Sequence, residues 1–309
     1  MTVKENILRI LMNSKGAVSG EALAKECGVS RNAVWKAINS LKDDGYGISG
    51  VNKIGYSFAG GDVLSAAELK CLLGDRMIEV YDSIGSTNTR AKELAALGAP
   101  DGSLVAASGQ TQGRGRFNRP FVSKNGTGLY MSLILRPDIP MSECMKLTAY
   151  AAVAASDALE SFGVDDVKIK WVNDLYLNGK KICGILTEGS ADFESGGLEY
   201  AVVGIGINLG EIEFSDELKD KATSVYNETG IKIPRCALAA EIIKRIENAK
   251  PDYMEKYRGR SCVIGKHVKV SNGIDSFEGL ITDIDKNGFL IVERNGAEVS
   301  VNAGEVIMK

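Results

Sequence analysis

The residues best suited to chemistry form the run Gly113–Arg116, in which glycines alternate with arginines inside a long segment from 108 to 128. Glycines let a backbone bend closely around an anion, and guanidinium groups neutralise carboxylates or phosphates through paired hydrogen bonds. No Gly-Lys-Ser/Thr follows, and Asn118 breaks the dinucleotide-binding spacing. The run therefore predicts an anion-binding loop of another kind. A solvated loop that touches nucleic acid nonspecifically is the alternative.

A second candidate set is polar and lies where a helix starts. Ser86, Thr87 and Asn88 precede the helical segment 90–97, which Gly98 ends. One hydrogen-bonding side chain suffices to cap a helix, so three in a row favour binding of a small polar ligand. Capping alone is the competing interpretation.

Hydrophobic spacing predicts the elements that would position these groups. The pair Asn178-Gly179 is a type I′ turn signal between two strands, and the glycines of 204–208 permit a ligand or a neighbouring backbone to approach the sheet. Adjacent hairpins predict a mixed or largely antiparallel sheet with helices on one face. We expect strands at 104–107, 129–135, 167–171, 181–186 and 200–209, and an alanine-rich helix at 142–162 that packs across them.

Histidine and cysteine are too few or too dispersed for several kinds of site. The 309-residue chain holds one histidine, His267, and six cysteines without a Cys-x-x-Cys pair. We therefore expect buried free thiols and a structural role for His267, and we predict no protein-built metal site. A Ser/His/Asp or Cys/His nucleophile is disfavoured for the same reason.

The first sixty residues predict a winged helix-turn-helix. Apolar spacing indicates one helix around Ile7–Leu11, a second at 21–27 and a third after Ser30, followed by a hairpin wing at 47–58 that turns near 52–55. The outer face of the third helix is predicted to bind DNA through Ser30, Arg31, Asn32, Lys36 and Asn39.

Charge supports this interpretation without deciding it. Residues 1–60 hold 8 Lys and Arg against 5 Asp and Glu, whereas the whole chain has a net charge of -3. A three-helix module for protein interaction or dimerisation is the alternative. Trp35 could contact DNA or pack within the protein, and packing is the preferred interpretation.

The remaining sequence predicts one more helix-rich stretch and a small β-barrel. Ser65-Ala-Ala-Glu68 is a capping-box pattern that opens a new unit, and one helix is expected from 235 to about 257. Short strands at 266–270, 277–285, 289–293 and 298–301 predict the barrel. No segment resembles a membrane span or a signal peptide, so a cytoplasmic location without membrane partners is expected.

Four motifs occur in the order found in bifunctional bacterial biotin-protein ligases, which also repress biotin genes. They are Gly-Arg-Gly-Arg at 113–116, Lys-Trp-Val-Asn-Asp-Leu at 170–175, Lys-Ile-Cys-Gly-Ile-Leu at 181–186 and Gly-Ile-Gly-Ile-Asn at 204–208. The chain resembles that family along its whole length. The resemblance implies an α+β multidomain protein: a winged helix-turn-helix at 1–61, a class II synthetase-like mixed sheet with helices at 62–258, and an SH3-like β-barrel at 259–309.

The resemblance also implies roles for matching residues. Catalytic roles fall on Arg116, Asp174 and Lys181. Nucleotide-binding roles fall on Arg116, Trp171, Asn173 and Asn208. Biotin-binding roles fall on Ser86, Thr87, Asn88, Gln110, Arg114, Gly115, Arg116 and Lys181.

The implied reaction uses ATP, Mg²⁺ and biotin. The biotin carboxylate would attack the α-phosphorus of ATP, and a lysine of a biotin carboxyl carrier protein would then attack the biotinyl adenylate. Adenylate binding would favour a homodimer that binds operator DNA.

The sequence departs from the family pattern at Asn118, Phe121 and Val172, where Gly, Trp and Pro are common. Only Asn118 bears on function, because it stands in the loop that must close; an asparagine adopts a left-handed conformation at modest cost. A biotin-sensing regulator with weak or lost ligase activity is therefore the alternative. A lipoyl-type ligase would not explain the motif order or the DNA-binding segment.

Overall fold

The structure is a computed structural model that describes residues 2–51, 54–191, 197–271 and 275–308. Its contacts divide the chain into two compact units. Unit 1 is Met1–Val80 with Ile233–Ala240, and unit 2 is Tyr81–Lys232 with Glu241–Lys309. Each unit is described by itself.

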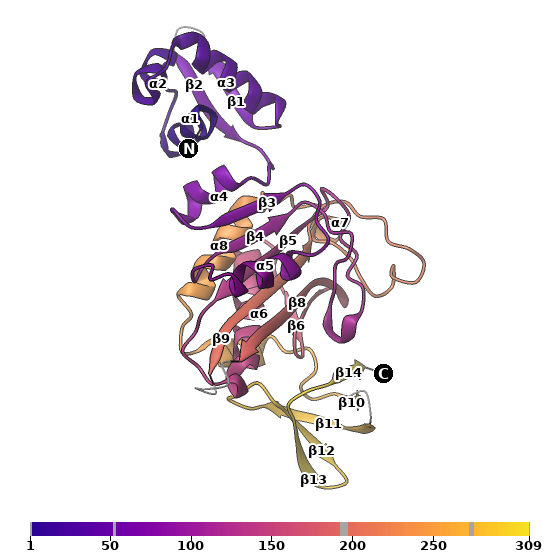
Figure 1. Ribbon diagram of the computed structural model, residues 1–309. Helices are drawn as coiled ribbons and strands as arrows, with labels where there is room; N and C mark the ends of the chain where they lie inside the picture. The colour runs from indigo at the N-terminus through magenta and orange to yellow at the C-terminus, as the bar shows by residue number, and fades with distance from the viewer. Residues whose placement is uncertain (1, 52–53, 192–196, 272–274, 309) are drawn as a thin grey trace. The chain divides into compact units, whose positions relative to one another are not determined.

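Unit 1 begins with the predicted three helices and a hairpin (Figure 1). Ser19 and Ser30 cap the second and third helices by accepting hydrogen bonds from Ala22 and Ala33, and Gly28, at φ 66°, ends the second. The predicted wing turn near 52–55 falls partly on residues 52 and 53, which lie outside the described residues. The elements are α1 (Val3–Asn13), α2 (Gly20–Cys27), α3 (Arg31–Asp43), β1 (Gly47–Val51) and β2 (Gly55–Gly60).

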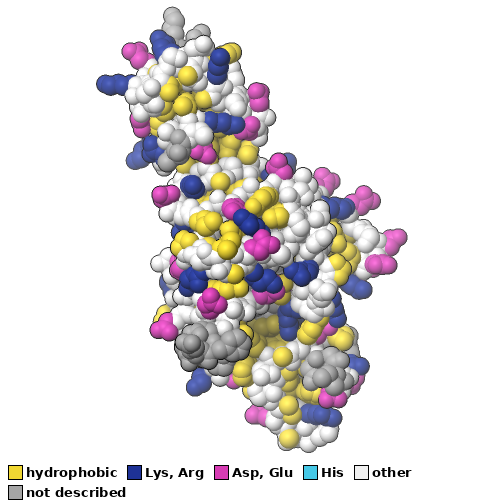
Figure 2. Space-filling model, viewed as in Figure 1, with side chains coloured by type: hydrophobic (Ala, Val, Ile, Leu, Met, Phe, Trp, Pro, Cys, Tyr) yellow, Lys and Arg dark blue, Asp and Glu magenta, His cyan; other side chains and the backbone are white. Residues whose placement is uncertain are grey.

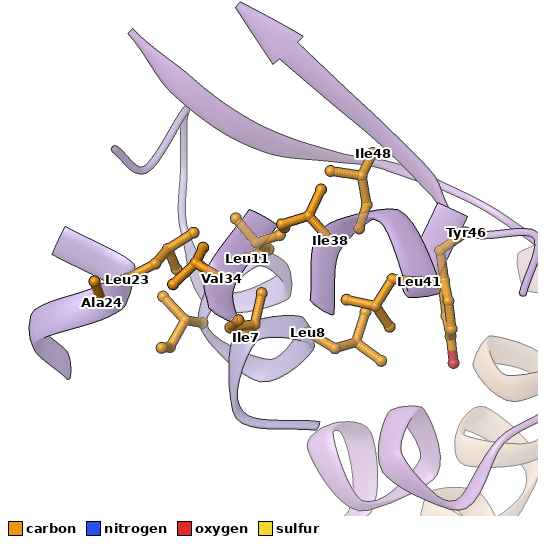
Figure 3. Packing of buried hydrophobic residues seen from close by; sticks show 11 residues of the cluster. Ile7, Leu8, Leu11, Leu23, Ala24, Val34, Ile38, Leu41, Tyr46 and Ile48 are labelled. Atoms are coloured by element: carbon orange, nitrogen blue, oxygen red, sulfur yellow. The ribbon is translucent and has the colours of Figure 1, made fainter. Parts of the chain in front are cut away.

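One apolar core holds these elements together. Figure 3 shows side chains of α1, α2, α3 and β1 converging on it, and each is at most 9% exposed. From α3 come Val34, Ile38 and Leu41, whose spacing of three and four residues places them on one side of the helix. The opposite side of α3 carries polar residues together with Trp35.

Unit 1 also contains α4 (Ala66–Leu73) and the start of α8 (Arg235–Glu247). The Arg235 guanidinium forms an ion pair with Asp62 at 3.0 Å. Ser65 caps α4 by accepting from the Glu68 amide, but the Glu68 side chain does not complete the predicted capping box. It is only 5% exposed, its Oε2 has no hydrogen-bond partner among the described residues, and burial raises its pKa to about 7, with Asp62 adding to the effect.

The largest sheet has the strand order β3-β4-β5-β9-β8-β7-β6, and its strands β4 to β9 lie in unit 2. Every pairing from β4 to β6 is antiparallel. Asn178 and Gly179 both have positive φ, as a type I′ turn requires. The strands are β3 (Ile78–Tyr81), β4 (Leu104–Ala107), β5 (Gly128–Leu135), β6 (Lys168–Lys170), β7 (Asp174–Leu177), β8 (Lys180–Ala191) and β9 (Leu198–Asn208).

Helices cover both faces of this sheet, so the prediction of helices on one face was wrong. The helix α5 (Thr87–Ala96) reaches the Glu188 side chain through Asn88, whereas α6 (Cys144–Ser161) reaches Thr187 through Thr148. Consecutive residues of a strand point to opposite faces. The hairpin pattern reports strand order, but it carries no information on which face receives each helix.

The single helix predicted from 235 to about 257 is two helices. The first, α8, ends at Glu247, and α9 (Tyr253–Gly259) begins after Pro251. A proline disfavours helical geometry in the residue before it, which explains the interruption. The remaining short helices are α7 (Val225–Thr229) and the 3-10 turns η1 (Arg116–Asn118) and η2 (Met141–Glu143).

The C-terminal strands form a separate five-stranded antiparallel sheet within unit 2, in the order β13-β12-β11-β10-β14. Its last strand, which the sequence did not predict, pairs with its first. The strands are β10 (His267–Ser271), β11 (Ser276–Ile284), β12 (Leu290–Arg294), β13 (Ala297–Val301) and β14 (Glu305–Met308). Among the residues that the structure describes, none of the helices has the length and apolar character needed to cross a bilayer.

Candidate active site

Unit 2 contains a cavity lined by α5, the loop 108–128, strands β8 and β9, and the edge of the C-terminal sheet. In Figure 2 several Lys and Arg side chains gather on this part of unit 2. The cavity brings together eleven of the predicted site residues: Ser86, Thr87, Asn88, Gln110, Arg114, Gly115, Arg116, Trp171, Asn173, Asp174 and Lys181.

Asn208 is the predicted site residue that does not line this cavity. It ends β9, is 6% exposed, and donates a hydrogen bond to the Thr223 carbonyl at 3.0 Å. The contact fastens the end of β9 to the segment before α7, so the structure assigns Asn208 a bracing contact.

The polar floor of the cavity is a connected hydrogen-bond network. Gln110 accepts from both the amide and the hydroxyl of Thr87, at 2.9 and 3.1 Å, and donates to Ser123 at 3.0 Å. Ser132, fully buried in β5, shares its single hydroxyl proton between the Thr87 hydroxyl at 2.8 Å and the Asn88 amide oxygen at 2.6 Å. Such a network holds each donor and acceptor in one orientation, which suits a floor that must recognise a polar ligand.

Asn88 is bound on all sides by protein. Its amide nitrogen donates to the Leu186 carbonyl at 3.2 Å and to Glu188 at 2.9 Å, while its oxygen accepts from Ser132. Glu188 in turn pairs with Lys92 at 2.5 Å. Burial opposes ionisation of Glu188, but the hydrogen bonds from Lys92 and Asn88 prevail and lower its pKa. Asn88 thus braces the floor more than it offers free hydrogen-bonding capacity.

Glycines in β9 make room for these side chains. A Cβ at Gly204 would lie 2.0 Å from the Asn88 amide oxygen, and one at Gly206 would lie 2.6 Å from the Phe121 ring. The glycines at 204 and 206 therefore do permit a close approach to the sheet, although the prediction named a ligand or a neighbouring backbone as the approaching group. Side chains of α5 and of the loop make that approach.

Cationic groups line the same cavity beside the floor. The Lys181 ammonium lies 2.7 Å from an Asp174 carboxylate oxygen, and Arg116 donates to the Asn173 side-chain oxygen at 3.5 Å. Burial lowers the pKa of the Arg116 guanidinium, although Asp174 and Glu305 act in the opposite direction. A partly buried cation with weak partners is stabilised by an incoming anion, so the cavity suits a carboxylate or phosphate.

The glycine-arginine loop contacts the C-terminal sheet. Arg119 forms a bidentate ion pair with Glu305 in β14, at 2.6 and 2.7 Å. The Trp171 indole N–H donates to the Gly288 carbonyl at 2.8 Å, and Trp171 is 3% exposed. The C-terminal strands therefore supply part of the cavity wall.

The loop also contains the backbone conformation anticipated at Asn118. Asn118 has φ 57°, in the left-handed region, and Phe117 before it has φ 55°. Asparagine tolerates this region better than most residues, whereas phenylalanine does not. Nothing in the sequence indicated the second of these two conformations.

Comparison with known proteins identifies the three parts. The Biotin/lipoate A/B protein ligase family matches residues 80–208, an HTH domain matches 3–57, and the Biotin protein ligase C terminal domain matches 263–309. The bifunctional ligase/repressor BirA of Bacillus subtilis is 36% identical over 95% of this chain and 95% of its own length. The chain belongs to the bifunctional biotin ligase/repressor family. BirA of Escherichia coli is 29% identical over all of this chain and 98% of its own.

The solved structures agree with this family. A biotin protein ligase from Aquifex aeolicus in complex with biotin and ATP covers 76% of this chain and 99% of its own, with 26% identity and a TM-score of 0.65. The chain is thus a biotin-protein ligase that carries a DNA-binding repressor domain.

In this ligase/repressor, the predicted DNA-binding residues are placed by α3. Arg31, Asn32 and Lys36 are exposed, Asn39 is partly exposed, and Ser30 uses its hydroxyl as the helix cap. Trp35 is 55% exposed and lies outside the core, so the preferred packing interpretation was wrong. A tryptophan next to a core residue such as Val34 can lie at the edge of the buried face or on the exposed face of a helix. The composition of the core shows that Trp35 lies on the exposed face.

Several residues of the ligase cavity escaped the sequence analysis. Ser132 and Glu188 brace the floor, and Lys170, Phe121 and Glu305 line the cavity. A lone serine inside the apolar strand 129–135 was a usable signal for Ser132, because an isolated hydroxyl in a buried strand needs a partner. Glu305 had none, since only the pairing of β14 with β10 brings it to the cavity.

Proposed function

We propose that the cavity joins biotin to ATP and then to a lysine of a biotin carboxyl carrier protein. The observation that carries the proposal is the convergence of Arg116 and Lys181 beside the neutral hydrogen-bonding floor formed by Thr87 and Gln110. The floor suits the polar, uncharged ring of biotin, and the cations suit its carboxylate and the nucleotide phosphate. Both molecules are bound in the related Aquifex aeolicus enzyme.

In the first step, a carboxylate oxygen of biotin attacks the α-phosphorus of ATP. A carbon-oxygen-phosphorus linkage forms, the bond to the bridging oxygen breaks, and pyrophosphate leaves with the electron pair. Negative charge grows on the nonbridging oxygens, where Arg116 and Lys181 offset it. Arg114 and Gly115 close over biotin, and Trp171 and Asn173 flank the nucleotide.

In the second step, the acceptor lysine attacks the biotinyl carbonyl carbon and AMP leaves. The attacking amine must be neutral and must lose a proton as the amide forms. We assign the role of accepting this proton to Asp174, which now pairs with Lys181 and is one of the two carboxylates lining the cavity. The loop 108–128 excludes water, because an exposed mixed anhydride would hydrolyse.

We place Mg²⁺ with the triphosphate. Among the described residues, no group of three acidic, histidine or cysteine side chains could hold a metal ion by itself. Oxygen ligands from phosphates and water, with a single carboxylate such as Asp174, fit the way magnesium accompanies nucleotides.

The larger assembly is also part of the proposal. The DNA-binding domain comprises residues 1–61, the catalytic domain residues 62–258 and the C-terminal domain residues 259–309. The C-terminal domain is an SH3-like β-barrel. The bound adenylate favours a homodimer in which two N-terminal domains bind a two-part operator.

The test mixes the protein with ATP, Mg²⁺, labelled biotin and an acceptor domain. Wild type should transfer label to the acceptor, and Lys181→Ala should not. Lys180→Ala is the matched control, because the Lys180 ammonium binds the Lys219 carbonyl at the surface. A folded wild type that binds biotin without transferring it would instead support a biotin-sensing regulator.

A further inference from the structure

The recognition helix α3 exposes one large apolar side chain among its polar ones. Trp35 is 55% exposed, and it does not belong to the core that holds α3 in place. Figure 3 shows the apolar side chains of α3 that do face that core, Val34, Ile38 and Leu41. Packing within unit 1 therefore does not account for the indole.

The position of Trp35 on the helix is informative. At about 100° per residue, Arg31, Trp35, Asn39, Asn32 and Lys36 lie within an arc of roughly 140°, which also holds Lys42 and Asp43 of the last turn. Arg31 and Lys36 form no ion pair with any residue in the described part of the chain. The indole thus lies on the same surface as two free cations and two amides.

Two occupants could cover this surface, DNA or a second copy of the chain. A second copy docking by the same face would bring Arg31, Lys36 and Lys42 close to their own counterparts, and the arc holds a single acidic residue, Asp43, to offset these three cations. DNA supplies the opposite charge through its phosphates, and base edges that match guanidinium and amide groups. Charge therefore favours DNA.

The apolar group that the major groove offers is the 5-methyl of thymine. We infer that Trp35 is a specificity-determining residue that contacts the methyl group of one or two operator thymines. The inference rests on DNA binding by the N-terminal domain. It adds that at least one base contacted in the operator is thymine. Arg31 and the two asparagines are matched to guanine and adenine, so Trp35 supplies the contact that those side chains cannot make.

The experiment replaces thymine by uracil, which removes the methyl group and keeps base pairing. The full chain, with biotin, ATP and Mg²⁺, first selects its sites from a random duplex pool. Each thymine of the selected duplex is then changed singly to uracil, and affinity is measured by fluorescence anisotropy. Wild type should bind about fourfold more weakly at the thymine that Trp35 contacts, which corresponds to one buried methyl group.

Trp35→Ala should bind the thymine and uracil duplexes equally well, with the thermal stability of wild type because the indole is exposed. Trp35→Phe, which keeps an apolar ring, should retain part of the discrimination. Lys36→Ala is the matched control: it should weaken binding to both duplexes by the same factor and leave their ratio unchanged.

Three results would overturn the inference alone. The first is equal binding of the thymine duplex and all uracil duplexes by wild type. The second is a Trp35→Ala variant whose thymine-to-uracil affinity ratio equals that of wild type. The third is a Trp35→Ala variant that keeps this ratio and also self-associates more weakly in sedimentation. If wild type enriches no sequence at all, DNA binding by this domain is wrong, and the inference falls with it.

Discussion

The proposed DNA-binding face of α3 and the proposed ligase cavity use their side chains in opposite ways. On α3, Arg31 and Lys36 extend from an apolar core and have no ion-pair partners among the described residues. In the cavity, Thr87, Asn88 and Gln110 are held by other side chains on nearly every polar atom. A surface that binds a long polymer needs extended side chains that are free to contact it. A site that performs chemistry needs side chains already fixed in position before the substrate binds.

This difference predicts how substitutions should behave. Changes at Arg31 and Lys36 should alter DNA binding and leave folding alone, because these exposed side chains do not pack in the core. Changes in the hydrogen-bonded floor of the cavity, which does not include Arg116, should spread through the network and affect stability and activity together.

The largest expected effect is that of Arg116→Ala on adenylate formation. Loss of one cation at the developing phosphate charge should lower the rate of pyrophosphate release by about 10²–10³-fold. Thermal stability should change little. Burial lowers the pKa of this guanidinium, which means that the folded protein gains little from holding its charge. Arg294→Ala is the matched control, since each guanidinium lies 5.0 Å from the centre of a phenylalanine ring. A similar loss in both variants would refute a special role for Arg116.

The next effect tests the packing of the floor. Gly204→Ala should lower the free energy of unfolding by about 1–3 kcal/mol and weaken biotin binding, because the new methyl group collides with Asn88. Gly50→Ala in the wing strand is its counterpart in unit 1, where the nearest atom would lie 3.8 Å away. Denaturant unfolding and biotin titration measure both. Equal losses of stability would contradict the contrast between the units.

A smaller effect is expected on the DNA face. Lys36→Ala should reduce DNA affinity by less than tenfold and reduce the salt slope by about 1, with ligase activity unchanged. Lys269→Ala removes the same charge from an exposed position of the C-terminal sheet. Anisotropy titrations across a salt series compare the two variants. The idea of an independent DNA surface fails if Lys36→Ala also slows biotin transfer.

The smallest effect concerns a buried carboxylate in unit 1, Glu68, and a partly buried one in unit 2, Glu188. The pKa of Glu68 is raised to about 7, so wild type loses stability as pH rises from about 4.5 to 7. Glu68→Gln should therefore stabilise the protein at pH 8 relative to pH 5, by about 1 kcal/mol once the buried amide is counted.

Glu188 should behave in the opposite way. Its pKa is lowered, so its contribution to stability is present above the unfolded pKa and is lost as pH falls through the folded one. Glu188→Gln should lower Tm at neutral pH and have little effect at pH 3. Thermal unfolding across pH checks both variants, and the same sign of change in both would contradict the assigned environments.

Much of the fold could be predicted from local signals. Ser19, Ser30 and Ser65 cap helices as their types and positions indicate, and Asn178-Gly179 forms the expected turn. Two of the failed predictions had different causes: one missed a local signal, and the other depended on contacts between distant residues. Pro251 was present but was not read as a helix break, and the faces chosen by α5 and α6 depend on which strands meet across the sheet.

The sequence by itself determined which residues could do chemistry, because glycine-arginine spacing, polar helix starts and ordered motifs are local features. It also determined the helix-turn-helix, whose core is built from neighbouring segments. Only the tertiary structure brought Ser132, Glu188 and Glu305 to the cavity and left Asn208 outside it. It also decided that Trp35 faces outward. These outcomes depend on contacts between residues far apart in the chain. Such contacts determine the free energy of burying or pairing each side chain.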